Sequence, residues 1–154
     1  MKPENYFKPR DKNFCRKVEE SFALQNAMKT IGCTIDTIEP GRIQLQFPYD
    51  EKLTQQHGFV HAGFIATAMD SACGYAAFSL MPENAAVLAV EFKVNFLAPA
   101  KGELFRIVGK VLKPGRTITV CQAEAFAIDG GDEKLVSQMT GTMMAVYDRE
   151  GISN

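Results

Sequence analysis

The sequence feature that most constrains the fold is the stretch His57–Met81, which reads HGFVHAGFIATAMDSACGYAAFSLM. It is the most apolar part of the chain and is rich in Ala, Gly and Ser, which are small enough for close packing. Its apolar residues would surround a helix on nearly all sides, which predicts a buried helix from about His61 to Leu80, ended by Pro82. One carboxylate, Asp70, lies in the middle of this helix. Because a buried acid needs a partner or a task, Asp70 is the first candidate functional residue.

The same stretch is about long enough to cross a bilayer, since roughly 20 apolar residues span the hydrocarbon core. We expect no membrane span, because Asp70 would lie at the bilayer centre at a cost on the order of 3 kcal/mol. The chain starts without the apolar segment of a secretory signal. Its net charge of −1 lacks the basic excess of a general nucleic-acid binder. These features predict a cytoplasmic protein with neither a membrane nor a nucleic acid as partner.

The cysteines of the chain are scattered and form neither a CxxC pair nor a zinc spacing. We expect four reduced thiols that act mostly as small buried apolar side chains: Cys15, Cys33, Cys73 and Cys121. The length of 154 residues suits one domain with a substantial core.

Hydrophobic periodicity predicts the remaining elements of the domain. Apolar residues at helical spacing predict one amphipathic helix over Asn13–Thr30. Alternating residues predict strands, separated by short turns, at 31–39, 42–47, 86–98, 103–112, 117–128 and 134–147. We therefore predict an α+β domain in which a six-stranded antiparallel meander wraps one long central helix.

The predicted domain covers residues 31–148, with an N-terminal helical extension at 1–30 and a frayed tail at 149–154. Long regular strands leave an edge that invites pairing with another chain. Pairing two such edges across a two-fold axis would cover them, so we expect at least a dimer.

Polar residues gather just before the long helix and at its start. His57 and His61 are four residues apart and would share one helical face, as metal ligands do. A metal ion needs a third ligand, but Asp70 lies nine residues after His61, about 13.5 Å away by helical rise. One helix cannot bring both side chains to the same ion, so we predict no metal site.

The start of the helix offers a different chemistry. Free backbone N–H groups and a partial positive charge at His61-Ala62-Gly63 would stabilise a carbonyl oxygen that becomes an oxyanion. Asp70 is too distant to act on that carbonyl within one chain, whereas the same residue of a second copy would reach it across a two-fold axis. The spacing thus favours a site between subunits, with the pKa of Asp70 raised by burial. Two structural alternatives stay open: Asp70 as a carboxylate bonded inside the dimer, and His61 bonded to the backbone.

The pattern Q-x5-HAG-x6-D-x3-G, on a helix between two strands and four more, resembles the hotdog-fold acyl-CoA thioesterases. The resemblance covers about residues 31–147. Within the family, the sequence is most similar to the branch that contains the phenylacetic-acid-pathway thioesterases and thioesterase superfamily member 2. That family has a histidine and two glycines at the helix start and an acid nine residues after the histidine. Here Ala62 replaces the first glycine. By this resemblance, the N–H of Ala62, with that of Gly63, forms the oxyanion hole, His61 supports the helix start, and Asp70 is the general base or the nucleophile.

Several positions differ from the family pattern or extend it. Six residues before the histidine, this branch often has asparagine. Gln55 stands there instead, which resembles the related glutamate-type 4-hydroxybenzoyl-CoA thioesterases, and its amide would hold water or the thioester. Ala89 stands where a relative has a serine that positions water or substrate. The turns around Lys101, Lys113 and Arg116 resemble those that contact coenzyme A, which makes these residues candidates for its phosphates. Candidate walls of the acyl pocket are Phe59, Phe64, Phe78 and Phe92.

The resemblance implies a hotdog-fold acyl-CoA thioesterase that releases a free acid and coenzyme A. It implies no metal and no cofactor, because coenzyme A is part of the substrate, and a homodimer that assembles to a homotetramer. The alternative is a non-catalytic acyl-CoA-binding hotdog protein, a sensor or scaffold that leaves the thioester intact. A hotdog hydratase, which pairs its acid with a nearby histidine, is disfavoured because both histidines precede Asp70 and none follows it.

Overall fold

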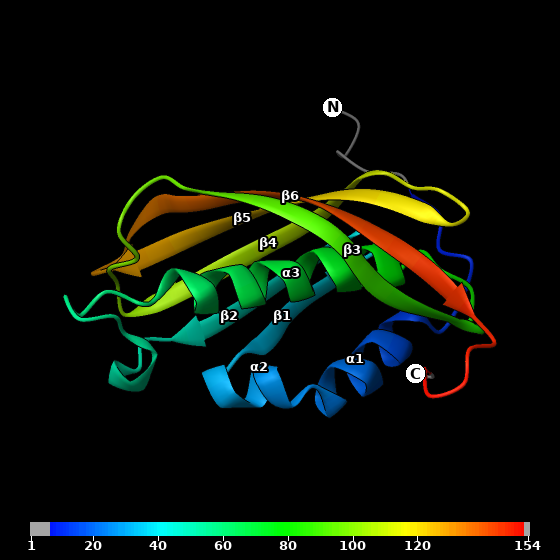
Figure 1. Cartoon of the computed structure of the whole chain (residues 1–154), viewed down its shortest axis with the longest axis horizontal. Coiled ribbons are helices and arrows are strands. Elements are labelled where there is room, and N and C mark those ends of the chain that lie inside the picture. Colours follow the sequence, from blue (N-terminus) through cyan, green and yellow to red (C-terminus); the bar gives the residue numbers. More distant parts are fainter. Residues whose placement is uncertain (1–6, 153–154) are drawn as a thin grey trace.

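The computed structural model describes residues 7–152, in which a curved sheet wraps one long helix (Figure 1). The helices are α1 (Phe14–Leu24), α2 (Asn26–Ile31), the short 3₁₀ helix η1 (Glu51–Leu53) and α3 (Ala62–Phe78). The strands are β1 (Thr34–Glu39), β2 (Arg42–Pro48), β3 (Ala85–Phe96), β4 (Leu104–Lys113), β5 (Ile118–Asp129) and β6 (Asp132–Tyr147). All neighbouring strands are antiparallel. The predicted α+β class and the helix wrapped by a six-stranded sheet are confirmed.

Small side chains let α3 approach the sheet closely. Strand β5 turns Cys121 and three alanines toward the core, and all four side chains are buried. On β4, a Cβ atom added to Gly109 would lie 2.4 Å from the backbone carbonyl carbon of Ala72. Because real Cβ atoms do not approach a backbone that closely, Gly109 fixes the distance between helix and sheet. Ala72 and Ala76 of α3 are themselves fully buried.

The strand order is β1-β2-β4-β5-β6-β3, which differs from the predicted simple meander. Strand β3 pairs with β6 at the far edge of the sheet instead of with β4, its successor in the chain. The reason is that both edges of β4 are occupied, one by β2 and the other by β5. Residues 97–103 therefore carry the chain from one edge of the sheet back to its interior.

The predicted single N-terminal helix is wrong, because α1 and α2 are separated at Gln25. Gln25 has an extended backbone, with ψ of 102°, and its side-chain oxygen accepts a hydrogen bond from Ser71 of α3 at 3.0 Å. This tertiary contact accompanies a break that helical periodicity does not reveal. Strand β1 also begins later than expected, because Gly32 ends α2 with a left-handed φ of 69°.

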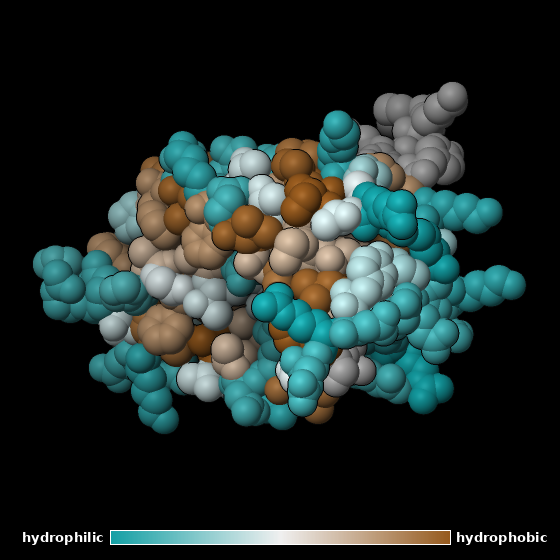
Figure 2. Space-filling model, turned by 45° about the vertical axis from the view of Figure 1, so that its right-hand side comes forward, coloured by the Kyte–Doolittle hydropathy of each residue, from teal (hydrophilic) through white to brown (hydrophobic). Residues whose placement is uncertain are grey.

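Strand β3 lies at the edge of the sheet and exposes apolar side chains. Leu88, Val90, Phe92 and Phe96 are between 37% and 55% exposed. Figure 2 shows one face of the molecule on which hydrophobic residues gather in the middle, with hydrophilic residues around them. An exposed apolar edge strand is a template for pairing with another chain.

None of the helices within residues 7–152 has the length and the apolar character needed to span a membrane.

Candidate active site

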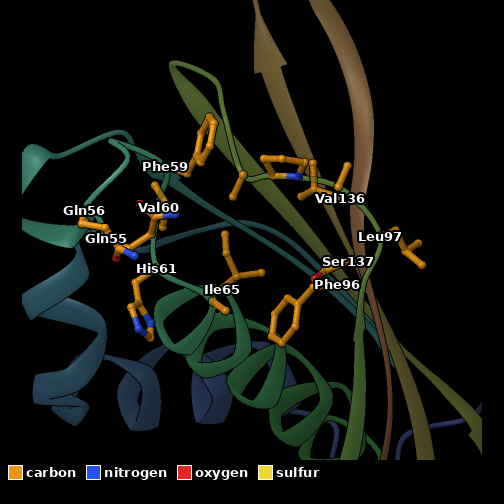
Figure 3. A pocket seen from close by; sticks show the side chains of 14 residues that line it. Gln55, Gln56, Phe59, Val60, His61, Ile65, Phe96, Leu97, Val136 and Ser137 are labelled. Carbon is orange, nitrogen blue, oxygen red and sulfur yellow. The ribbon is translucent and has the colours of Figure 1, made fainter.

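The larger of two pockets relevant to the predicted site lies at the N-terminus of α3, and we name it the helix-start pocket (Figure 3). Its volume is about 640 Å³. One side is formed by the loop before α3, including Gln55 and Phe59, and by the first turn of the helix. The other side is formed by the last residue of β3, Phe96, by residues 97–100 after it, and by Val136 and Ser137 of β6. Most of these side chains are apolar, so the pocket suits an uncharged reacting group.

His61 is the N-cap of α3. Its backbone is extended, with φ of −61° and ψ of 136°, and its ring atom Nδ1 accepts a hydrogen bond from the Gly63 N–H at 2.9 Å. An accepting Nδ1 leaves the proton of the neutral ring on Nε2. His61 therefore supports the helix start, which is the structural alternative considered for it from the sequence.

The first turn of α3 leaves one backbone donor free. The N–H of Gly63 donates to the His61 ring, and the N–H groups of Phe64 and Ile65 donate to the His61 carbonyl at 3.0 and 3.4 Å. Within residues 7–152, the N–H of Ala62 has no acceptor. Ala62 also lines the helix-start pocket, whereas Gly63 does not. The donor available to a ligand is therefore that of Ala62.

Gln55 is held in a tight turn beside this donor. Its side-chain oxygen accepts a hydrogen bond from the backbone N–H of His57, and its backbone N–H donates to the Phe59 carbonyl at 2.9 Å. The Gly58 N–H donates to the Gln55 carbonyl at 3.0 Å. The turn fixes the Gln55 amide at the pocket wall, where no acceptor among residues 7–152 occupies its NH₂ group.

The smaller pocket, of about 270 Å³, contains Asp70, and we name it the acid pocket. Residues of α3 and β3 form it together with the N-terminal segment and one residue of β6: Ser21, Leu24, Gln25, Asp70, Ser71, Gly74, Tyr75, Val87, Ala89 and Met143. The Asp70 atom Oδ1 is buried and has no hydrogen-bond partner within the described residues. Burial raises the pKa of the Asp70 carboxyl above its ordinary value, in the direction expected from the sequence.

Ala89, which stands where a relative has a serine that positions water or substrate, lines the acid pocket together with Asp70. The strand therefore supplies no hydroxyl to Asp70 at this position. The four phenylalanines considered as pocket walls separate in the structure. Phe59 lines the helix-start pocket, Phe64 is half-buried at the helix start, Phe78 is fully buried in the core, and Phe92 is exposed on β3.

The two pockets share no residue within one chain. Asp70 lies about 13.5 Å along α3 from His61, so one protomer does not bring the carboxylate to the Ala62 N–H. No group of three potential metal-ligating residues occurs within residues 7–152. A reaction that uses both pockets needs a second copy of the chain.

The cations predicted to bind phosphate lie at two places. Lys101 precedes β4 and lines a further pocket with Tyr49 and Gly58, close to the helix-start pocket. Lys113 ends β4 and Arg116 follows it, at the opposite end of a strand roughly 30 Å long. All three side chains are exposed. One chain therefore does not bring Lys101 together with Lys113 and Arg116.

The buried cysteine thiols are poorly suited to act as nucleophiles here. Cys33, Cys73 and Cys121 are buried, as predicted, while Cys15 is exposed, and all four are free. Burial raises the pKa of Cys33 to about 12 and that of Cys121 to about 12. A thiol with so high a pKa carries almost no thiolate at neutral pH.

Sequence analysis missed several polar residues at the two pockets. Ser137 lines the helix-start pocket, and its hydroxyl is buried without a partner within the described residues. Its neighbour Val136 is also buried, so strand alternation did not single it out. Ser71 and Tyr75 lie one and five residues after Asp70 on α3, so helical spacing from Asp70, which pairs residues three or four apart, did not single them out. Gln25 was missed because its segment was interpreted as a surface helix.

Comparisons with known proteins agree with this geometry. The sequence profile of the thioesterase superfamily matches residues 57–134. A crystal structure of a thioesterase family protein from Silicibacter pomeroyi has a TM-score of 0.86 and 58% sequence identity, and the match covers 87% of this chain and 98% of that one. Human acyl-coenzyme A thioesterase 13 is 26% identical over 113 residues, which are 73% of each chain. The Escherichia coli PaaI protein, from the phenylacetic acid degradation operon, shares the fold, with a TM-score of 0.78 at 17% identity over 89% of this chain and 96% of that one.

A long helix wrapped by this sheet, with a free N–H at the helix start and a half-buried acid whose Oδ1 is fully buried, defines a hotdog-fold hydrolase. The chain belongs to the thioesterase superfamily. The predicted family and the predicted class of enzyme, a thioester hydrolase, are thereby confirmed.

Proposed function

We propose that this protein is an acyl-CoA thioesterase whose active sites form between two copies of the chain. The observation that carries the proposal is the Asp70 carboxylate, whose buried Oδ1 has no hydrogen-bond partner in the described residues. A buried polar atom without a partner costs free energy, and a catalytic task explains why the chain keeps it. The similarity to a human protein named as an acyl-coenzyme A thioesterase supports coenzyme A as the thiol.

The edge strand β3 supports a shared site. The Val87–Ala89 end of β3 lines the acid pocket, and Phe96 at its other end lines the helix-start pocket. Antiparallel pairing of two β3 edges about a two-fold axis would place the acid pocket of one protomer beside the helix-start pocket of its partner. It would also cover the apolar side chains that β3 exposes. Each dimer would then contain two complete sites.

The residues suggest a simple sequence of steps. The thioester carbonyl binds at the Ala62 N–H, where the helix N-terminus stabilises the oxyanion. Asp70 of the other protomer takes a proton from the attacking water, or attacks the carbonyl itself to form a mixed anhydride that water then hydrolyses. The coenzyme A thiolate leaves and takes up a proton, and the acid is released. Gln55 orients the water or the thioester, and His61 and Gly63 hold the helix start.

The remaining parts of the proposal have weaker but specific support. Lys101 is the cation best placed for a coenzyme A phosphate, because Pro99 and Ala100 beside it line the helix-start pocket. Lys113 and Arg116 would serve a phosphate only if another protomer brings them near. We also propose that the dimers assemble to a homotetramer. Free thiols support a cytoplasmic location.

The test is hydrolysis of a panel of CoA thioesters (acetyl, hexanoyl, palmitoyl, phenylacetyl and 4-hydroxybenzoyl), followed by release of free thiol. We expect turnover of at least one member, lost in Asp70→Asn and kept in the matched surface variant Asp132→Asn. Tight binding without turnover in any variant would instead identify a sensor or scaffold. Turnover that survives Asp70→Asn would show that the chemistry lies elsewhere.

A further inference from the structure

The hydroxyl of Ser137, on β6, is buried in the wall of the helix-start pocket without a hydrogen-bond partner among the described residues. We infer that this hydroxyl holds the attacking water in the active site shared between protomers, and that it replaces a hydroxyl that Ala89 of the other protomer cannot supply. The inference rests on the proposed function and deepens it, because it assigns a further catalytic residue to the same site.

A β-bulge turns Ser137 toward the pocket. The register between β5 and β6 shifts between Ala125 and Phe126, which leaves Val136 of β6 without a pair on β5. Consecutive strand residues normally face opposite sides of a sheet, yet Val136 and Ser137 are both buried and both line the helix-start pocket. Bulges re-aim side chains and are frequent next to active sites. The backbone therefore brings a hydroxyl to a pocket whose walls are mostly apolar.

The surroundings of Ser137 indicate that its hydroxyl serves a bound molecule. Ser137 is 1% exposed, and its Oγ has no hydrogen-bond partner within residues 7–152. Its pairs on the neighbouring strands are Ala125 and Phe96, whose side chains carry no polar atom. A buried hydroxyl without a partner costs free energy, which a bound water recovers. Alanine would fill the same place without this cost, so the chain gains from the hydroxyl in some other way.

Ser137 lies where the two halves of the proposed active site would meet. Figure 3 shows it beside Phe96, at the end of the helix-start pocket away from Gln55. Phe96 is the last residue of β3, and antiparallel pairing of two β3 edges would bring it toward Ala89 of the other protomer. Ala89 lines the acid pocket with Asp70. The hydroxyl that β3 does not supply to Asp70 would thus come from β6 of the facing protomer.

The hydroxyl has a defined task when Asp70 acts as the general base. As water attacks the thioester carbonyl carbon, one of its hydrogens passes to Asp70 of the other protomer, and the carbonyl electron pair moves to the oxygen at the Ala62 N–H. Ser137 Oγ accepts a hydrogen bond from the second hydrogen of the water and neither gains nor loses a proton. The C–S bond then breaks, and the coenzyme A thiolate takes the proton from Asp70. Two contacts would thus aim the water at the carbonyl carbon.

Removal of the hydroxyl should affect the reaction and not the fold. In Ser137→Ala, we expect kcat for a hydrolysed CoA thioester to fall about tenfold, the effect of one hydrogen bond, with KM unchanged. The urea midpoint should not fall, because the hydroxyl has no partner in the described chain. Thr140→Val, which removes an exposed hydroxyl from β6, is the matched control and should keep kcat. Adding Ala89→Ser to Ser137→Ala should restore most of the lost kcat, since it returns a hydroxyl to the same site.

A mixed dimer tests whether Ser137 and Asp70 of different protomers serve one site. One protomer carries Asp70→Asn, the other carries Ser137→Ala, and two affinity tags allow the mixed dimer to be purified. With shared sites, one site of this dimer keeps both residues and the other lacks both, so we expect about half of the wild-type activity. If both residues acted within one protomer, one site would lack the acid and the other the hydroxyl. Activity would then be about one-twentieth of the wild type.

Each remaining outcome has a defined meaning. Asp70-dependent hydrolysis with kcat unchanged in Ser137→Ala, a change in KM alone, or one-twentieth activity in the mixed dimer would overturn the inference, while acyl-CoA hydrolysis itself would still stand. If no thioester of the panel is hydrolysed, the proposed function fails and the inference fails with it. If Ser137→Ala does not fold, Ser137→Cys keeps nearly the same size with a weak acceptor and should show the same fall in kcat.

Discussion

At the scale of single residues, Ala62 is the position where a backbone group rather than a side chain carries the proposed chemistry. The ring of His61 occupies the neighbouring Gly63 N–H, and the following amides are bonded within the turn. This arrangement explains how alanine can replace the glycine of the family pattern. The backbone donor is the same for both residues, provided that the helix start keeps its geometry.

Ala62→Pro removes this donor with little other change. Proline suits the first position of a helix, and the extended backbone of His61 is what a residue before proline requires. We expect kcat to fall about 100-fold or more, as when one oxyanion donor is lost, with the free energy of unfolding changed by less than about 0.5 kcal/mol. Steady-state kinetics and urea unfolding measure both. An equal loss in Ala62→Ser, which keeps the N–H, would contradict the assignment.

Asp70 should make stability depend on pH in a defined direction. Its pKa is about 3.8 in the unfolded chain, and burial raises it in the folded chain. As pH rises through the window above 3.8, the folded state keeps its proton longer, so the free energy of unfolding falls. Asp70→Asn, which cannot ionise, should be more stable than the wild type by about 1 kcal/mol at pH 7 and nearly equal to it at pH 4. Urea unfolding between pH 4 and pH 8 measures this, with Asp132→Asn as the control; a gain at pH 4 equal to that at pH 7 would contradict it.

At the scale of elements, the contact between α3 and β4 fixes where the helix lies. Gly109 faces the backbone of Ala72, and any larger residue on the strand would displace the helix. Both pockets are built partly on α3, so this one contact on the core side positions the Ala62 N–H and the Asp70 carboxylate together.

Gly109→Ala should therefore destabilise the protein, although alanine is the smallest possible addition. We expect a loss of about 2 kcal/mol or more in the free energy of unfolding, because the added Cβ meets backbone atoms that cannot rotate away. Gly74→Ala is the matched change, since its Cβ would meet nothing within 4 Å. In the helix interior it should stabilise by up to about 1 kcal/mol. Chemical denaturation measures both, and equal effects would show that the close approach does not limit packing.

At the scale of the whole molecule, the exposed edge of β3 is the feature that a single chain leaves unexplained. Val90 lies at a bulge between the pairs that Ala89 and Glu91 make with β6, and it is 55% exposed. Charged side chains on an edge strand prevent its pairing. Loss of the proposed dimer would separate Asp70 from the other protomer's Ala62 N–H, where the thioester carbonyl is proposed to bind.

Val90→Lys should therefore give a folded monomer without thioesterase activity, even though Val90 lines neither pocket. Leu112→Lys on β4, which is 49% exposed, is the matched change away from β3 and should keep the dimer and its activity. Sedimentation, circular dichroism and thiol release measure assembly, folding and turnover. A fully active monomer would contradict a site shared between subunits.

The sequence by itself determined the local structure, because hydrophobic periodicity, turn residues and helix signals act over a few neighbouring residues. It predicted the buried helix, the six strands and the isolated Asp70, and the HAG motif led to the thioesterase family. Only the tertiary structure decided the order of β3 in the sheet, the break at Gln25 and the polar residues of the acid pocket. Those features depend on which strand edges are already occupied and on hydrogen bonds such as that between Gln25 and Ser71, 46 residues apart, which no local pattern contains.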